Sequence, residues 1–201
     1  MRNRIICIGR ECGSGGHEVA VRLAERLGIR AYEKDLLHLA CQYGGLDVKT
    51  LESSDERATN PYLFQTVHEG NHRVTRGLPT SEVLFQLQSH EICRIAREES
   101  CVFVGRCANY VLRDLDVSVL SVLIRAPEEQ RVERKMRLEN LSRQKAKRLV
   151  RRLDAQRKKY YEHYTGLAWG KADGYDLCLD CGEIDLPQAV ELLAQRYEAM
   201  R

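Results

Sequence analysis

The chain has 201 residues, of which 43% are hydrophobic and 30% are charged, and its formal net charge is +3. This length suits one soluble globular domain and is too short for two generous domains. No apolar run approaches the roughly 18 residues that cross a bilayer, and the first ten residues are too short for a secretory signal. We therefore expect a cytoplasmic protein with no membrane partner.

The first part of the chain alternates short apolar runs with amphipathic segments. Residues 4–9, RIICIG, are β-branched and apolar and predict a buried strand. Apolar residues between 19 and 27 recur at helical spacing until Gly28, which is a typical helix end. Residues 29–32 predict a second short strand, which leads into a leucine-rich helix.

The middle of the chain is less regular. From 44 to 79 the sequence is polar and contains several glycines, so we expect helical pieces joined by mobile loops. Thr80 precedes a long helical pattern. Residues 101–106, CVFVGR, predict a buried strand that runs into a glycine. A further strand ends before Pro127, a residue that suits the first turn of a helix.

Two basic helical segments follow, the second of them after Ser142, a typical N-cap residue. Between residues 131 and 159 there are 13 lysines and arginines but only three acidic residues. Such a segment indicates a nucleic-acid-binding patch, a solvated helix face or a set of cations for polyphosphate. A strand at 175–180 and a closing amphipathic helix complete the chain.

Short apolar strands that alternate with amphipathic helices predict a parallel sheet covered on both faces, because each connecting helix has to bury its apolar stripe. The predicted fold class is therefore α/β, with three layers in a single domain, residues 1–201. Ligands of such sheets bind beyond the carboxyl ends of the strands. Residues 9–16 and the pair Gly105 and Arg106 follow predicted strands and are expected there.

The segment GRECGSGGHEVA, residues 9–20, is typical of a loop that binds phosphate at a helix N-terminus. In the regular loop, GxxxxGK[ST], the lysine reaches the terminal phosphates and the hydroxyl binds magnesium. Counting back from the helix puts Arg10 at the first glycine, Gly16 at the lysine and His17 at the hydroxyl. The residues that suit close approach of the main chain to a phosphate are Gly13, Ser14, Gly15 and Gly16.

Plain structural roles are the alternatives at several of these positions. The loop alone is also consistent with a tight turn that binds nothing, and His17 with a capping group in the first helical turn. Cys178 and Cys181 have the spacing of a zinc or redox pair, but the sequence contains no matching second pair of ligands. We therefore expect the eight cysteines to be structural thiols and the protein to hold no metal through them.

Further segments give the loop a context. The stretch from GRECGSGGHEVA to YEKDLL resembles the opening of the cytidylate kinase-like family of nucleoside monophosphate kinase folds. FVGRCANYVLRD, APEEQRVERKM, LDAQRKKYYEHYTGLAWG and YDLCLD resemble its later segments. The resemblance covers almost the whole chain apart from about residues 44–90. It implies a P-loop NTPase-type sheet with a monophosphate-binding insertion at about 34–95 and a helical lid at about 131–160.

The resemblance also implies which residues contact the nucleotides. Residues 13–16 would hold the β-phosphate region of ATP, with His17 at the position of the magnesium hydroxyl. Arg106 matches an arginine that grips the acceptor phosphate. Cys107 follows it where cytidylate kinases have an aspartate.

The remaining correspondences lie in the acceptor segment and the lid. Glu33 falls at the start of the acceptor segment, where this chain has EKD in place of D-[ST]-G. Arg131 and Arg134 match arginines that open the lid. Asp154 and Arg157 match a D-x-x-R pair that, in cytidylate kinases, addresses the cytosine and the acceptor phosphate.

Phosphoryl transfer depends mainly on positioning and on stabilisation of charge, so a cationic lid suits it. We expect Arg10 or Arg134 to offset the missing lysine, because a guanidinium grips phosphate in a bidentate manner. The expected activity is transfer from ATP, with Mg²⁺, to a nucleoside monophosphate or similar small phosphate acceptor. The alternatives are a nucleotide-binding regulator without turnover and a nucleic-acid-binding protein that uses residues 131–159. The identity of the acceptor and the oligomeric state stay open.

Overall fold

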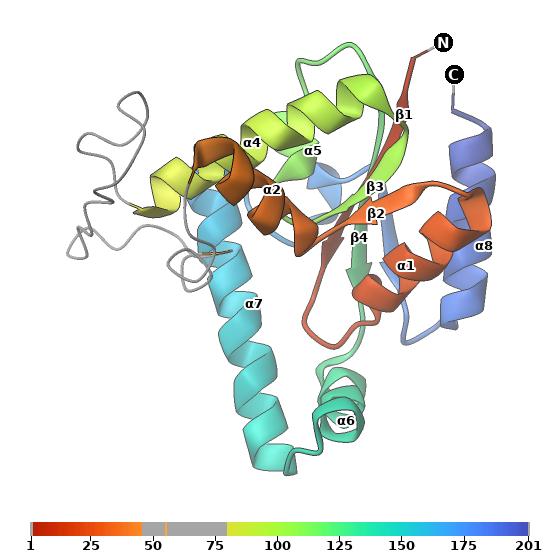
Figure 1. Ribbon diagram of the computed structural model, residues 1–201. Helices are drawn as coiled ribbons and strands as arrows, with labels where there is room; N and C mark the ends of the chain where they lie inside the picture. Colours follow the sequence, from red (N-terminus) through yellow and green to blue (C-terminus); the bar gives the residue numbers. More distant parts are fainter. Residues whose placement is uncertain (1, 46–54, 56–79, 201) are drawn as a thin grey trace.

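A computed structural model describes residues 2–45, 55 and 80–200 of the chain (Figure 1). Its strands are β1 (Arg4–Arg10), β2 (Arg30–Tyr32), β3 (Cys101–Val104), β4 (Ser118–Arg125) and β5 (Leu177–Asp180). They form one parallel sheet in the order β2-β3-β1-β4-β5. After β1 the chain continues to β2 at one edge of the sheet, and after β4 it continues to β5 at the other edge. Parallel sheets bind ligands at the carboxyl ends of two neighbouring strands whose connections diverge in this way.

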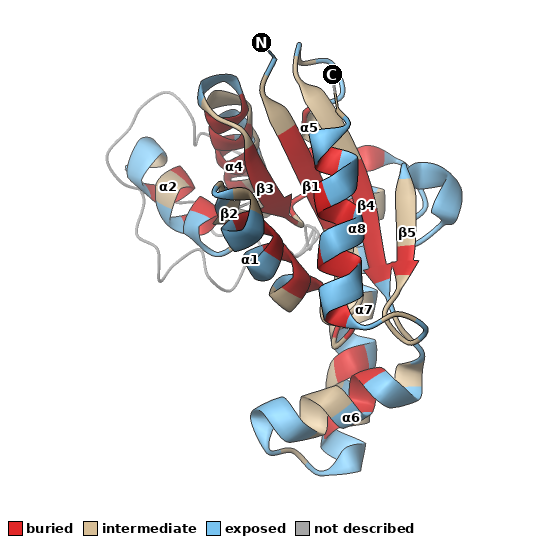
Figure 2. Cartoon of the chain, turned by 90° about the vertical axis from the view of Figure 1, so that its right-hand side faces the viewer, coloured by how far each residue is buried: buried red, intermediate tan, exposed pale blue. Residues whose placement is uncertain are grey.

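Helices cover both faces of this sheet, which gives three layers. The helices are α1 (Gly16–Leu27), α2 (Asp35–Gly44), α4 (Thr80–Glu98), α5 (Ala108–Val111), α6 (Glu128–Glu139), α7 (Arg143–Thr165) and α8 (Leu186–Glu198), with a short 3-10 helix at Ala172–Gly174. α1 and α8 pack together on one face, and α4 and α5 cover the other. Figure 2 shows the buried strands between α8 and α4. The predicted α/β class and its layers are therefore confirmed.

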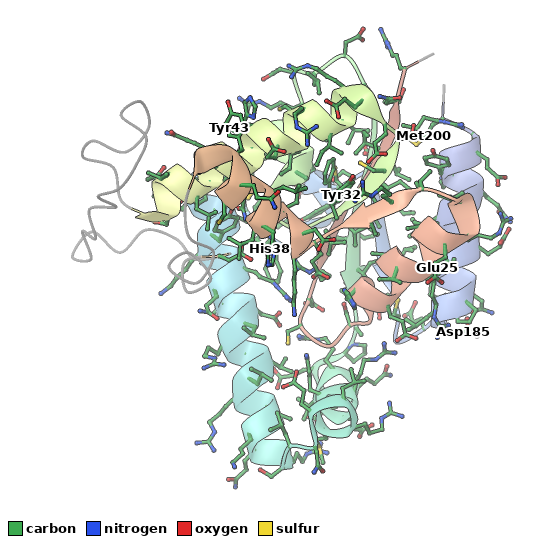
Figure 3. All side chains as sticks on the ribbon, in the orientation of Figure 1. Glu25, Tyr32, His38, Tyr43, Asp185 and Met200 are labelled. Carbon is green, nitrogen blue, oxygen red and sulfur yellow. The ribbon has the colours of Figure 1, made fainter. Side chains whose placement is uncertain are left out.

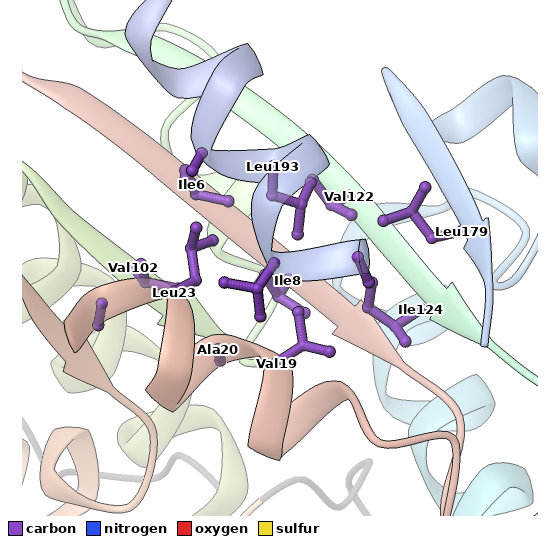
Figure 4. Close-up of a cluster of buried hydrophobic side chains, with 14 of the residues drawn as sticks. Ile6, Ile8, Val19, Ala20, Leu23, Val102, Val122, Ile124, Leu179 and Leu193 are labelled. Carbon is purple, nitrogen blue, oxygen red and sulfur yellow. The ribbon is translucent and has the colours of Figure 1, made fainter. Parts of the chain in front are cut away.

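The strand residues divide between two cores because successive side chains of a strand point to opposite faces. On β1, Ile6 and Ile8 pack with Leu23 of α1 under the α1–α8 layer (Figure 4). Ile5 and Cys7 pack on the other face, under α4 and α5. Since both faces are covered, the strand is a continuous apolar run in the sequence, as expected for a buried parallel strand.

α6 and α7 form a helix pair that extends away from the sheet, beyond the carboxyl ends of the strands (Figure 1). Its small core contains Val132, Ala146 and Val150, together with Cys12 from the loop between β1 and α1. Side chains that end in nitrogen project from both helices (Figure 3). Among the described residues, no helix is both long and apolar enough to cross a membrane.

Several predicted boundaries differ from the observed ones. The strand expected at 101–106 ends at Val104, because Gly105, Arg106 and Cys107 all take left-handed conformations, with φ of 78°, 54° and 56°. The short helix α5 follows them and was not predicted, since four residues are too few for a helical period to be visible. The strand expected at 175–180 begins at Leu177.

Other predictions concern parts of the chain that are described only in part. The segment expected to contain helical pieces and loops, 44–79, lies outside the described residues except for Gly44, Gly45 and Asp55. The eight cysteines all lie in the described part and form no disulfide with one another, which agrees with the expectation of thiols.

Replacing Leu23 with alanine tests the α1–α8 layer. Leu23 is fully buried in the cluster beneath these helices. We expect Leu23→Ala to lower the free energy of unfolding by about 3 kcal/mol, because the lost contacts leave a cavity. Leu192→Ala on α8, where the side chain is 37% exposed, should cost less than about 1 kcal/mol. Equal costs for the two variants in denaturant unfolding would contradict this packing.

Candidate functional site

The glycine loop, residues 11–15, connects β1 to the first turn of α1. Gly13 and Gly15 have φ of 81° and 94°, a conformation that residues with a side chain rarely adopt. Gly15 is also the N-cap of α1. A Cβ at Gly13 would lie 2.6 Å from the backbone oxygen of Arg131 on α6, and one at Gly15 would lie 2.6 Å from Nη1 of Arg134. The loop needs its glycines both for its conformation and because α6 approaches it closely.

Gly16, the residue at the position of the usual lysine, has a different constraint. A Cβ at Gly16 would lie only 2.5 Å from the Cβ of Arg10. Arg10 ends β1 and is 7% exposed, and its Nη2 donates a hydrogen bond to Glu33 Oε1 at 2.9 Å. The loop therefore has no room for a side chain at Gly16, because the first carbons of the Arg10 side chain lie against that position.

Glu33 follows β2 and joins two of the predicted site residues. Its carboxylate contacts Arg10 through one oxygen and Nδ1 of the exposed His17 through the other. Burial opposes ionisation of this group, but the charges of Arg10 and His17 outweigh that effect and hold the pKa of Glu33 below its ordinary value. Arg10 and His17 thus surround an ionised Glu33 carboxylate at the start of α1.

A cleft of about 640 Å³ opens above the glycine loop, between α1 and the helix pair. The predicted residues that line it are Arg10, Gly13, Gly15, Gly16, His17, Glu33, Arg134 and Arg157. Ser14 is buried, and its hydroxyl donates to the Glu11 carbonyl inside the loop. Backbone N–H groups in the first turn of a helix have no intrahelical acceptors and favour anions. The cleft thus combines such a terminus with the guanidinium groups of Arg10, Arg22, Arg134 and Arg157.

A second and much smaller pocket, of about 40 Å³, lies beyond the carboxyl ends of β1 and β3. Arg10 and Arg157 line this pocket as well as the cleft, so the two cavities meet at these two cations. The remaining lining combines Arg106 with polar and aromatic side chains, namely Asn109, Tyr160, Tyr161, Trp169 and Tyr175. Asn109 donates a hydrogen bond to the Tyr161 hydroxyl at 3.0 Å. Tyr160, Tyr161 and Trp169 belong to an aromatic cluster of the core and also line the pocket.

Arg106 is buried, with 4% of its surface exposed, and lies in the second pocket as predicted for a residue that follows β3. Its Nη1 donates to the Val104 carbonyl at 3.1 Å, and its Nη2 contacts Asp55 Oδ2 at 2.6 Å. Gln88 of α4 donates to the other oxygen of Asp55 at 3.0 Å. A carboxylate of the protein itself therefore neutralises the Arg106 guanidinium.

Arg131 and Asp154, which were also predicted to contact substrate, lie between the glycine loop and the helix pair. Nη1 of Arg131 lies 2.5 Å from Asp154 Oδ2, and Asp154 Oδ1 accepts a hydrogen bond from the Cys12 N–H at 2.7 Å. The same Arg131 nitrogen donates to the Cys12 carbonyl at 3.3 Å, while Nε donates to the Ala126 carbonyl at 2.8 Å. Neither Arg131 nor Asp154 lines the cleft or the second pocket.

Sequence reasoning missed two residues that the site uses, Glu11 and Asp55, and considered Cys12 only as a thiol beside the site. Glu11 accepts from the Ala126 N–H at 3.1 Å and lies 3.4 Å from Nε of Arg131, and burial raises its pKa despite these contacts. Cys12 inserts into the helix pair. The only sequence signal for Glu11 and Cys12 is their place inside the glycine loop, and Asp55 lies in a stretch without a recognisable pattern.

Comparison with known proteins supports the resemblance. The model of the cytidylate kinase-like family matches residues 5–183. A cytidylate kinase from Methanopyrus kandleri is 27% identical over 183 residues, which are 88% of this chain and 83% of that protein.

Solved structures support the fold. An uncharacterized protein from Eubacterium ventriosum superposes with a TM-score of 0.73 at 27% identity, over 98% of this chain and 99% of that one. Shikimate kinase from Acinetobacter baumannii, in complex with shikimate, gives 0.54 at 14% identity over 99% and 94%. Mycobacterium tuberculosis APS kinase, in complex with AMPPNP and APS, gives 0.52 at 14% over 98% and 99%. The last two similarities concern the fold alone.

Restoring the usual lysine tests the constraint at Gly16. We expect Gly16→Lys to lower the free energy of unfolding by roughly 2 kcal/mol, because the new Cβ collides with Arg10 and the loop has to shift. Gly174→Lys, at a position with no atom within 4 Å of the added Cβ, should change stability by less than about 0.5 kcal/mol. A Gly16→Lys protein as stable as the unmodified chain in urea unfolding would show that the space exists.

The pairing of Glu33 with Arg10 predicts a pH dependence. Glu33→Gln should lower the free energy of unfolding by roughly 2 kcal/mol at neutral pH, because the buried Arg10 loses its charged partner. Since the folded-state pKa of Glu33 is lowered, this contribution is complete above its ordinary value of 4.5 and is lost as the pH falls through the lowered pKa. Glu25→Gln, on the exposed side of α1, serves as the control in unfolding curves measured from neutral to acidic pH. A Glu33→Gln deficit that does not shrink in acid would contradict the assignment.

Proposed function

The chain belongs to the cytidylate kinase-like family, and we propose that it transfers a phosphoryl group from ATP to a nucleoside monophosphate or a similar small phosphate acceptor. One observation carries the proposal: the cleft above the glycine loop and the second pocket meet at Arg10 and Arg157. A phosphoryl transferase has to bring a donor phosphate and an acceptor together with cations between them. Family membership supports a nucleotide kinase. The cleft has room for the donor phosphates, whereas the second pocket, at about 40 Å³, has to widen before it can receive an acceptor.

In this proposal the cleft receives the donor phosphates. The N–H groups at the start of α1 and the helix dipole favour the charge of the β-phosphate region. Arg134 of α6 lies directly over Gly15 and is held by Glu18, 3.5 Å away, which leaves a guanidinium at the mouth of the loop. These groups are positioned to stabilise negative charge without a large rearrangement. Such preorganised electrostatic stabilisation supplies most of the rate increase in phosphoryl transfer.

In this proposal Arg10 supplies the cation that the usual lysine would bring to the phosphates. Its side chain lies against Gly16, and Glu33 fixes its direction. Because it lines both cavities, its charge can act on the phosphoryl group as it moves from donor to acceptor. Arg157, which donates to the Arg10 carbonyl at 3.3 Å, adds a second cation at the same point.

The acceptor binds in the second pocket, with its phosphate at Arg106. Asp55 now contacts this guanidinium, so an acceptor phosphate has to exchange with a carboxylate of similar geometry and charge. The aromatic walls contributed by Tyr161, Trp169 and Tyr175 are suited to a planar ring, since offset stacking on such faces is favourable. This arrangement supports an acceptor that carries both an anionic and an apolar part.

The cleft also suits Mg²⁺ bound together with ATP. Mg²⁺ in nucleotide sites takes one or two carboxylates and substrate phosphates rather than a complete protein cage. Glu11, Glu18 and Glu33 line the cleft and are the residues that would hold it, directly or through water. Within the described residues there is no group of three or more His, Cys, Asp or Glu side chains that could hold a metal ion. When bound, the ion neutralises charge on the donor phosphates.

The alternative functions make different use of the same residues. A nucleotide-binding regulator would bind ATP without turnover. A nucleic-acid-binding protein would use the cations of 131–159, but many of them already pair with carboxylates on the helix pair and α1: Arg131, Arg134, Lys135, Arg143, Lys147, Arg151 and Lys158. Such pairing favours a charged, solvated surface over a phosphate-backbone patch.

Production of ADP from ATP and Mg²⁺, measured with a panel of nucleoside monophosphates, tests the proposal. We expect turnover with at least one acceptor and a loss of about 100-fold or more in kcat/KM for Arg106→Ala, because the acceptor phosphate loses its buried partner. Arg113→Ala removes an exposed arginine that pairs with Asp114 and serves as the matched control.

The possible outcomes separate the candidate functions. ATP binding without turnover for any acceptor would favour the regulator and contradict the kinase proposal. Turnover that Arg106→Ala leaves unchanged would move the acceptor site away from the second pocket.

A further inference from the structure

The glycine loop is attached to the helix pair at several points. The Cys12 N–H donates to Asp154 of α7, and the Cys12 carbonyl accepts from Arg131 of α6. The Cys12 side chain, 3% exposed, packs among the apolar residues between the two helices. At Gly13 the backbone of α6 approaches so closely that no side chain would fit. One residue of the loop thus contributes its N–H, carbonyl and side chain to the same interface.

Asp154 is the residue on which this attachment depends. One of its oxygens accepts from Cys12 and the other contacts Arg131, so both are engaged inside the protein. Arg131 is 8% exposed and would be a costly buried cation without that carboxylate. The cluster also includes Glu11, which contacts Nε of Arg131. Charge neutralisation therefore holds α6, α7 and the loop together.

We propose that Asp154 is a positioning residue of the donor site, one that fixes the glycine loop and, through Arg131, holds Arg134 over it. This proposal rests on the proposed function, because it takes the cleft as the place where ATP binds. Arg134 lies one helical turn after Arg131 and therefore on the same side of α6. Anchoring Arg131 to the loop fixes Arg134 beside Gly15, where its Nη1 lies.

Because of these contacts, we expect the base of the helix pair and the glycine loop to move together. A displacement of α6 would draw the Arg131 backbone away from Gly13 and break the contact with Cys12. The donor cation is therefore already in place before any closure of the helices, which lowers the reorganisation required when ATP binds. Occupation of the loop and the position of the helix pair are expected to be coupled, each stabilising the other.

The correspondence with cytidylate kinases leads to a different expectation for Asp154, namely a role at the acceptor site. There, the matching aspartate addresses the acceptor base, so its loss would weaken the acceptor. In this chain Asp154 is absent from the lining of the second pocket and engaged by the loop. The two accounts therefore differ in which substrate loses affinity.

Titration of the protein with ATP, together with donor and acceptor KM values, tests the proposal in Asp154→Asn. The asparagine retains an oxygen for Cys12 but loses the charge that Arg131 needs. We expect ATP to bind roughly tenfold or more weakly and the acceptor KM to change by less than about twofold. Lys158→Gln, an exposed change on the same helix, is the control and should leave both values unaltered. A raised acceptor KM with unchanged ATP affinity would overturn the proposal.

A double-mutant cycle and hydrogen exchange give readouts that do not depend on turnover. Arg131→Gln and Asp154→Asn should be strongly non-additive in ATP affinity, because each removes the same interaction. The Cys12 amide should exchange slowly in the unmodified protein and in Lys158→Gln, and much faster in Asp154→Ala.

These readouts also keep the two proposals apart. Unchanged exchange of the Cys12 amide in Asp154→Ala would overturn the attachment, whatever the activity. If the unmodified protein failed to bind ATP, the proposed function and the donor-site role of Asp154 would both be refuted. The exchange data would still decide whether Asp154 holds the loop.

Discussion

The side chain of Arg10 lies against Gly16, in the space that any side chain at the head of α1 would need. Much of the site follows from this contact. The loop keeps glycine there, and we propose that its cation comes from the end of β1 rather than from the helix. A guanidinium in that buried position requires an anion, and Glu33 at the end of β2 supplies it. Since β1 lies in the middle of the sheet, the cation stands where the two cavities meet.

The charged residues of the site are arranged in pairs rather than as free cations. Arg10 pairs with Glu33, Arg106 with Asp55 and Arg131 with Asp154, and each pair joins segments that are distant in the sequence. Pairing neutralises each arginine and fixes its direction while it is held away from water. The pairs also differ in what they offer a substrate. Those of Arg10 and Arg106 line cavities, whereas that of Arg131 attaches the loop to the helix pair.

The sequence was sufficient to predict the layers of the fold and the general place of the site. Strand β1 is a continuous apolar run, α1 has a clear helical period, and both the glycine loop and Arg106 follow predicted strands, so their meeting at one edge of a parallel sheet could be derived. The partners of the arginines could not be derived in this way. Asp154 is 23 residues from Arg131 and Glu33 is 23 from Arg10, and only the packing of α6, α7 and β2 brings these groups together. The left-handed backbone at Arg106 and Cys107 likewise depends on tertiary contacts, because neither residue favours it intrinsically.

The central claim is that Arg10 acts in place of the usual lysine. The most direct measurement is a crystal structure of the protein with Mg²⁺ and a non-hydrolysable ATP analogue. We expect the β-phosphate in the glycine loop and the Arg10 guanidinium within hydrogen-bonding distance of the β- or γ-phosphate, with Arg134 on the other side. A triphosphate bound away from the loop would contradict the account. So would one bound in the loop with Arg10 turned away and another cation in contact with the γ-phosphate.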